Sequence, residues 1–259
     1  MKRVSSFLLL SSLALLFSVP LTAQSTMFQS QNLSSGLVGW WRLCGDSSAT
    51  SGCNASASTA IYDSSGNGSN GTWHGTQSGT TGWYSAGKVG PWSGTFDSTD
   101  NYVDLGQPSV LALTNAMTVT AWVDLPSAAG QVMFLGLTGS YTYFSLNGAG
   151  TIYVYLTTSG MPSGSQVSHA CSSWNSNGWN FLAMTYSSSS GYLSLYCNGG
   201  NAWQVSYGGT LTVPGTYDYT IGARHGGTSP LFSGQINDVR IYNRALSQPE
   251  LAKMYLAHN

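Results

Sequence analysis

The sequence predicts an all-β protein built as an antiparallel sandwich. Only 8 basic and 9 acidic residues occur in 259, or 7% of the chain, against roughly 25% in an average domain. Glycine occurs 32 times and aromatic residues make up 12%. From Gly36 onward, short runs of alternating apolar and polar residues are separated by Gly, Ser and Asn turns about every 8–15 residues, which is the pattern of a β-sandwich.

The same composition excludes three other classes of protein. A disordered chain is poor in aromatic residues. A helical bundle needs abundant charged helix formers, and this chain has one glutamate, Glu250. A nucleic-acid-binding protein needs a basic surface, whereas the net charge here is −1.

The first 23 residues have the three parts of a secretory signal. A basic start, Met1-Lys2-Arg3, precedes an apolar run over residues 4–19, and Ala23 is a small residue at the expected cleavage point. The alternative is an uncleaved anchor, but a spanning helix needs about 20 apolar residues. We expect a secreted, periplasmic or cell-surface protein with a polar leader over residues 24–35 and a single domain over residues 36–259.

Cleavage would leave 6 basic and 9 acidic residues, a net charge of −3. Solubility then depends on Ser, Thr, Asn and Gly. Such a surface suits neutral, hydroxylated partners rather than nucleic acid or anionic lipid, and no membrane insertion is expected after cleavage.

An even number of cysteines in an exported chain indicates disulfides. Cys44 and Cys53 flank a short Gly/Ser/Ala segment, while Cys171 and Cys197 each end an alternating run that could form neighbouring strands. We therefore favour the pairs Cys44–Cys53 and Cys171–Cys197 among three possible pairings. A zinc site is the alternative, but no C-x-x-C pair is present.

Alternation with a period of two identifies several strands and their faces. In residues 117–123, 152–156 and 192–197, one face is aliphatic and the other carries polar or aromatic residues. The predicted outward set is rich in tyrosine. Near the C-terminus, Ser247 can cap a short helix, because Pro249 lies in its first turn and Glu250 lies three residues after the cap.

Six segments resemble bacterial LamG-like (laminin G-like) jelly-roll domains of the concanavalin A-like superfamily, in family order over residues 37–256. They are LVGWWRL (37–43), DSSGNGSNGT (63–72), GKVG with FD and YVDLG (87–106), MTVTAWV (117–123), WNFLAMTY (179–186) and FSGQINDVRIYNRALS (232–247). The resemblance implies a two-sheet antiparallel jelly roll.

The resemblance also implies one structural calcium, where the DSSGN loop meets the last long strand. The matching positions in this chain are Asp63, Asn67, Asn70, Thr72 and Asp238. Calcium prefers six to eight carboxylate, amide and carbonyl oxygens. The family has an acidic pair before VRIY, and here the pair is Asn237-Asp238, which removes one carboxylate. The alternative is that Asp63 only closes a tight Asx turn.

Some relatives with this fold are glycoside hydrolases, whose chemistry needs two carboxyl groups about 5–10 Å apart. The E-x-D-x-x-E arrangement of beta-glucanases cannot be supplied by a chain with a single glutamate. Asp97, Asp100 and Asp104 lie close in sequence but are typical of a structural strand and turn. We therefore expect no catalysis.

Flat aromatic faces with amide and hydroxyl groups around them commonly recognise neutral sugars. The predicted outward tyrosines are Tyr143, Tyr153, Tyr155, Tyr192 and Tyr196, and further candidates are the loop tryptophans Trp73, Trp83, Trp92, Trp174 and Trp203. Aromatic residues also pair across strands simply to stabilise a sheet. The sequence thus predicts a non-catalytic module that binds a neutral glycan or, as an adhesive module, a cell-surface protein, since the fold alone does not decide between them.

Overall fold

The computed structural model describes residues 33–44, 59–76, 83–126, 132–136, 143–200, 203–212, 218–224 and 231–259. For residues 132–135 and 161–164 it describes the backbone alone. Leu33–Asn259 form one compact unit. The expected signal segment 1–23 and Cys53 lie outside the described residues, and no described helix is long and apolar enough to cross a bilayer.

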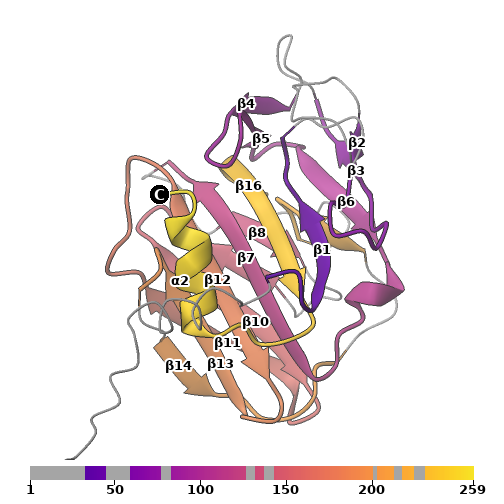
Figure 1. The fold of residues 1–259 in the computed structure, drawn as a ribbon, viewed down its shortest axis with the longest axis vertical. Helices are drawn as coiled ribbons and strands as arrows, with labels where there is room; N and C mark the ends of the chain where they lie inside the picture. Colours follow the sequence, from indigo (N-terminus) through magenta and orange to yellow (C-terminus); the bar gives the residue numbers. More distant parts are fainter. Residues whose placement is uncertain are drawn as a thin grey trace, which may run out of the picture. The chain divides into compact units, whose positions relative to one another are not determined.

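The first sheet is antiparallel, with its longest strands at the centre (Figure 1). Its order is β14 (Trp203–Ser206), β13 (Tyr192–Cys197), β12 (Asn180–Ser187), β7 (Ala116–Asp124), β16 (Ser233–Tyr242), β5 (Trp92–Asp97) and β4 (Tyr84–Ala86), and β1 (Leu37–Trp41) also pairs with β16. β5 and β1 pair with successive parts of β16, residues 233–236 and 239–242.

The second sheet is also antiparallel, with a strand of 10 residues at one edge and a strand of 2 residues at the other. Its order is β11 (Met161–Ala170), β10 (Thr151–Thr158), β9 (Tyr143–Leu146), β8 (Val132–Gly136), β15 (Tyr219–Ile221), β6 (Tyr102–Gly106), β3 (Gly71–His74) and β2 (Ala60–Ile61). A short 3-10 helix, η2 (Ser109–Leu111), follows β6.

The inward side chains of both sheets form one hydrophobic core. In the first sheet it includes Val119, Ala121 and Val123, and in the second it includes Ile152, Val154 and Leu156, all less than 2% exposed. The alternation predicted from the sequence is therefore confirmed in these strands. Because the aliphatic residues of both sheets point into this core, every second residue of each strand is directed to an outer face.

One helix, α2 (Gln248–Leu256), lies over the outer face of the first sheet (Figure 1). Its residues Leu251 and Met254 pack in a second cluster with Trp122 and Phe181 of β7 and β12. Ser247 and Glu250 form the capping box expected from the sequence. The predicted two-sheet antiparallel sandwich with a short C-terminal helix is confirmed.

A β-bulge in β16 sets the direction of Asp238. Asn237 and Arg240 pair with Trp122 and Thr120 of β7, so two residues of β16 lie opposite one residue of β7. Asp238 has a positive φ of 55°, which is uncommon for a residue other than glycine. Bulges of this kind redirect a side chain, and here the Asp238 carboxylate faces Trp40 of β1.

Candidate functional site

Three of the predicted tyrosines share the outer face of the second sheet. Tyr153 and Tyr155 alternate along β10 with the buried Val154, and Tyr143 precedes the buried Phe144 on β9. Tyr155 pairs directly with Tyr143 across the two strands. The register continues this row through Gly136 of β8, Thr220 of β15, Asp104 of β6 and Thr72 of β3.

Tyr143 and Tyr155 form a stacked pair at the centre of this group. Their ring centroids are 5.4 Å apart with an interplanar angle of 26°. The guanidinium of Arg224 lies 5.9 Å from the Tyr143 ring, and burial raises the pKa of the Tyr143 hydroxyl above its ordinary value. Tyr143 therefore remains a neutral hydrogen-bonding group at physiological pH.

Polar side chains accompany the tyrosines on the same face. Tyr153 pairs with Ser168 of β11 on one side and with the fully buried Ser145 of β9 on the other, and Tyr155 pairs with Gln166. The side-chain amide of Asn147 donates to the Tyr153 hydroxyl over 3.3 Å. Aromatic rings bordered by hydroxyl and amide groups commonly recognise neutral sugars.

A second stacked pair lies at the other end of this face. The rings of His74 on β3 and Tyr102 on β6 are 4.7 Å apart and almost parallel. Burial, followed by the nearby carboxylates of Asp104 and Asp218, raises the pKa of Tyr102. The sequence does not predict this pair as ligand-binding residues, because their contact depends on the pairing of β3 with β6.

Tyr192 and Tyr196 do not join this surface, contrary to the expectation of one five-tyrosine face. Both lie on β13, which belongs to the first sheet, and they point to the outer face of that sheet. Tyr192 is 48% exposed, whereas Tyr196 is 6% exposed because it packs in the cluster beneath α2. The candidate surface is therefore limited to Tyr143, Tyr153 and Tyr155.

The candidate tryptophans are mostly engaged in the fold. Trp73 and Trp83 are buried in the core and stack on each other with centroids 5.5 Å apart. Trp92 is partly buried against the core, and Trp203 of β14 stacks on His169 of β11 across the gap between the two sheets. Trp174 holds its loop in place, because its indole nitrogen donates to the carbonyl of Gly148 over 3.1 Å.

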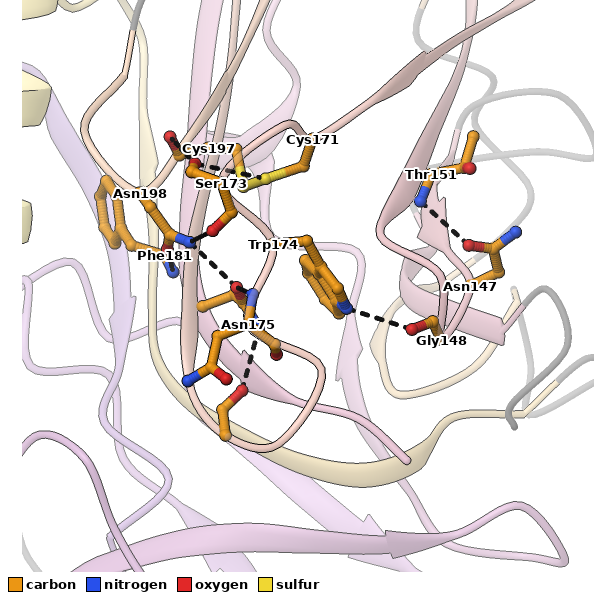
Figure 2. The surroundings of a disulfide bond; sticks show 12 residues. Asn147, Gly148, Thr151, Cys171, Ser173, Trp174, Asn175, Phe181, Cys197 and Asn198 are labelled. Atoms are coloured by element: carbon orange, nitrogen blue, oxygen red, sulfur yellow. Dashed lines mark hydrogen bonds between the residues drawn. A yellow bond between two sulfur atoms is a disulfide. The ribbon is translucent and has the colours of Figure 1, made fainter. Parts of the chain in front are cut away.

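A disulfide joins the two sheets at one end of the sandwich (Figure 2). Cys171 follows β11 of the second sheet and Cys197 ends β13 of the first sheet, and their Cα atoms are 5.9 Å apart. This is the pairing predicted from the sequence, but it links two sheets rather than two neighbouring strands. Cys44 is also disulfide-bonded, and its expected partner, Cys53, lies outside the described residues.

A small cavity of about 210 Å³ opens beside this disulfide. It lies between β10 and β11 of the second sheet and β13 of the first, and its walls include His169, Ser172, Ser173 and Tyr196. The described lining contains no carboxylate, lysine or arginine. Ligand pockets are commonly about 300–1,000 Å³, so this cavity is small for an oligosaccharide, and we place the candidate site on the tyrosine face instead.

Two of the predicted calcium ligands, Asp63 and Asp238, bind Trp40 through their carboxylates. Asp63 is buried and its carboxylate accepts four hydrogen bonds, from the Trp40, Ser65 and Ser69 amides and from the Ser65 hydroxyl, at 2.8–3.0 Å. A carboxylate offers about four lone-pair positions, so those of Asp63 are filled. This is the Asx turn of the alternative interpretation.

Of the other predicted ligands, Asn67 and Asn70 also form side-chain hydrogen bonds. The Asn70 side-chain oxygen accepts from the Asp63 amide, and the Asn67 side chain donates to the carbonyls of Leu37 and Val38. Thr72 lies on β3 in the second sheet, paired with Ala60 and Asp104.

Asp238 accepts from the Trp40 indole over 2.6 Å and from Arg240. Among the described residues, no group of three or more His, Cys, Asp or Glu could hold a metal ion. Because N–H and O–H groups already bind the carboxylates of Asp63 and Asp238, these two side chains do not fit the role of calcium ligands, which use their oxygens to bind the ion.

The acids considered for catalysis serve local structure. One oxygen of the Asp97 carboxylate accepts from three successive backbone amides in the turn after β5, Asp100 accepts from the amide and hydroxyl of Thr76, and Asp104 accepts from the amide of Gly106. Glu250 is bound by Arg244 through two hydrogen bonds of 3.0 and 2.6 Å. These interactions explain why the acids are present without reference to catalysis.

Comparison with known families identifies the fold. A model of the concanavalin A-like lectin/glucanases superfamily matches residues 97–252. The chain belongs to this superfamily. The superfamily resemblance of the six sequence segments is therefore confirmed, although no curated protein matches the sequence.

Several solved structures share the fold of this superfamily member. The binding domain of Paraclostridial Mosquitocidal Protein 1 is similar with a TM-score of 0.64 and 15% identity, over 87% of this chain and 53% of that one. Domain 4 of AbnA, a GH43 extracellular arabinanase from Geobacillus stearothermophilus in complex with arabinotriose, has a TM-score of 0.59 and 19% identity, over 85% and 98%. The binding domain of botulinum neurotoxin DC in complex with SialylT has a TM-score of 0.60 and 11% identity, over 88% and 53%.

Proposed function

We propose that this chain is a secreted, non-catalytic binding module that recognises a neutral glycan on the outer face of its second sheet. The observation that carries the proposal is the stacked pair Tyr143 and Tyr155, with Tyr153 beside it, on a face bordered by serine and amide side chains. A sugar ring presents an apolar face to such an aromatic surface and hydroxyl groups to the surrounding polar side chains.

The low charge of the chain agrees with a neutral ligand. Burial keeps the Tyr143 hydroxyl protonated and therefore uncharged. The guanidinium of Arg224, a basic group beside this surface, lies against the Tyr143 ring. One structurally similar protein was solved in complex with arabinotriose and another in complex with SialylT. Their identity to this chain is below 20%, so they favour a glycan as the class of ligand without naming it.

The proposal is tested by binding to an array of neutral oligosaccharides, including arabino-oligosaccharides, followed by titration with the tightest of them. We expect Tyr155→Ala to weaken this binding at least about tenfold, equivalent to about 1.4 kcal/mol. Tyr192→Ala is the matched control, because Tyr192 is exposed on the outer face of the other sheet and its removal should leave the affinity unchanged.

Two outcomes would contradict the proposal. Equal losses in Tyr155→Ala and Tyr192→Ala would show that the tyrosine face is not the site. If the unaltered protein binds no glycan but captures a surface protein, the adhesive module is the correct function.

A further inference from the structure

Asn237 occupies a fully buried position in β16, at the β-bulge described above, and is 0% exposed. Its side-chain oxygen accepts hydrogen bonds from the backbone amides of Lys88 and Val89, at 3.0 and 2.6 Å. Its side-chain nitrogen donates to the backbone carbonyls of Arg42 and Trp92, at 2.7 and 3.2 Å. These four contacts involve both hydrogens of the amide and both lone pairs of its oxygen.

These contacts join three separate segments to β16. Arg42 directly follows β1, Lys88 and Val89 lie in the connection between β4 and β5, and Trp92 begins β5. The surroundings also fix the orientation of the amide, because two N–H donors face its oxygen and two carbonyl acceptors face its nitrogen. Exchanging the oxygen and nitrogen would leave all four contacts with like groups facing each other.

A carboxylate at this position would lack the two donors that the carbonyls of Arg42 and Trp92 require. One carboxylate oxygen and the carbonyl oxygens of Arg42 and Trp92 would then face one another in a buried site. A bound cation would remove the repulsion among these three oxygens. Carboxylate and carbonyl oxygens are the ligands that calcium prefers. The Asn237 NH₂ group therefore lies where a cation would be needed if residue 237 were acidic.

We infer that the Asn237 amide replaces a metal ion in this chain, so that the junction of β1, β5 and β16 forms without calcium. This differs from the calcium expected from the family resemblance, and it does not depend on the proposed glycan binding. The predicted calcium ligands Asp63 and Asp238 agree with it, because N–H and O–H groups already occupy the carboxylate of Asp63 and Arg240 faces that of Asp238.

The charges around Trp40 support the same inference. The carboxylates of Asp63 and Asp238 receive the backbone and indole N–H groups of Trp40. The guanidinium carbons of Arg42 and Arg240 lie 4.8 and 4.4 Å from the Trp40 ring. Two negative and two positive side chains thus surround one tryptophan, and no additional positive charge is needed to balance them.

The test measures thermal unfolding of the whole chain in calcium and in chelator, for the unaltered protein and for Asn237→Asp. We expect the unaltered protein to unfold at the same temperature in both conditions. Asn237→Asp should unfold at least about 5 °C lower in chelator than in calcium. Terbium, titrated as a calcium analogue with excitation of tryptophan, should give sensitised emission in Asn237→Asp and none in the unaltered protein.

Asn243→Asp is the matched control, because it adds the same charge at an exposed position just after β16 and should respond equally in calcium and chelator. A rise in the unfolding temperature of the unaltered protein on adding calcium would overturn the inference. So would an Asn237→Asp variant that unfolds equally in both conditions and gives no terbium signal. If Asn237→Asp does not fold, the test rests on the unaltered protein, whose unfolding temperature in calcium is compared with that in chelator.

Discussion

The Glu250 carboxylate accepts hydrogen bonds from both terminal nitrogens of Arg244 and from the backbone and hydroxyl of Ser247. Arg244 in turn donates to the carbonyl of Ser35. The Arg244 side chain therefore joins three segments: the start of α2, the segment after β16 and the turn that precedes β1. The pKa of Glu250 is lowered from 4.5 to about 2, mainly by the hydrogen bonds from Arg244.

A lowered carboxyl pKa gives a defined pH dependence of stability. The contribution of Glu250 should be complete above about pH 4.5 and should be lost as the pH falls toward about 2, because the unfolded state then binds the proton more readily. We expect Glu250→Gln to lower the free energy of unfolding at neutral pH by about 1–3 kcal/mol. Urea unfolding at a series of pH values measures both effects.

The difference between Glu250→Gln and the unaltered protein should disappear near pH 2. Arg244→Lys is an informative control, because lysine keeps the charge but cannot make two parallel hydrogen bonds to a carboxylate. It should show part of the loss at neutral pH. Equal stability of Glu250→Gln and the unaltered protein at neutral pH would contradict this role of Glu250.

At the scale of elements, the loop between β11 and β12 passes from the second sheet to the first and is held at several points (Figure 2). The Cys171–Cys197 disulfide fixes its start, the Trp174 indole binds the turn between β9 and β10, and the Asn198 side chain donates to the Ser173 carbonyl. The cysteines are 26 residues apart. The disulfide therefore restricts a chain segment that would otherwise be free in the unfolded state.

Replacing both cysteines with serine should lower the free energy of unfolding by about 3 kcal/mol, since closing a loop of this length reduces the entropy of the unfolded chain by that amount. Chemical denaturation measures the loss. The double variant is preferable to a reducing agent, because Cys44 also forms a disulfide. Trp174→Phe keeps the disulfide but removes the hydrogen bond to the Gly148 carbonyl and should lose much less, so similar losses in the two variants would attribute the effect to the loop contacts.

The faces of individual strands could be predicted from the sequence, but their assignment to sheets could not. Tyr153 and Tyr192 alternate with aliphatic residues in the same way, which gives each a face without showing which sheet it joins. Pairing places β10 in the second sheet and β13 in the first. Burial of Tyr196 beneath α2 and the stacking of His74 on Tyr102 likewise depend on contacts between distant segments, which periodicity does not contain.

At the scale of the whole molecule, the two outer faces of the sandwich differ in kind. The outer face of the first sheet is covered in part by α2, with Trp122, Phe181 and Tyr242 buried there. The outer face of the second sheet presents the three tyrosines beside hydroxyl and amide groups. Family membership and the two-sheet fold could be predicted from six sequence segments. The choice of one face as the candidate site required the structure.

The shortage of charge over the whole chain predicts how ligand binding should respond to salt. With 17 charged residues in 259 and a net charge of −1, the protein has little long-range field, and a neutral glycan contributes no charge. Salt screens interactions between exposed charges. The dissociation constant for the neutral oligosaccharide should therefore change less than about twofold between low and high salt, measured by titration calorimetry.

A sialylated oligosaccharide is the comparison, because any affinity that depends on its carboxylate and Arg224 should decrease as salt increases. A large loss of affinity for the neutral glycan in high salt would indicate that charged groups, rather than the tyrosine face, dominate binding.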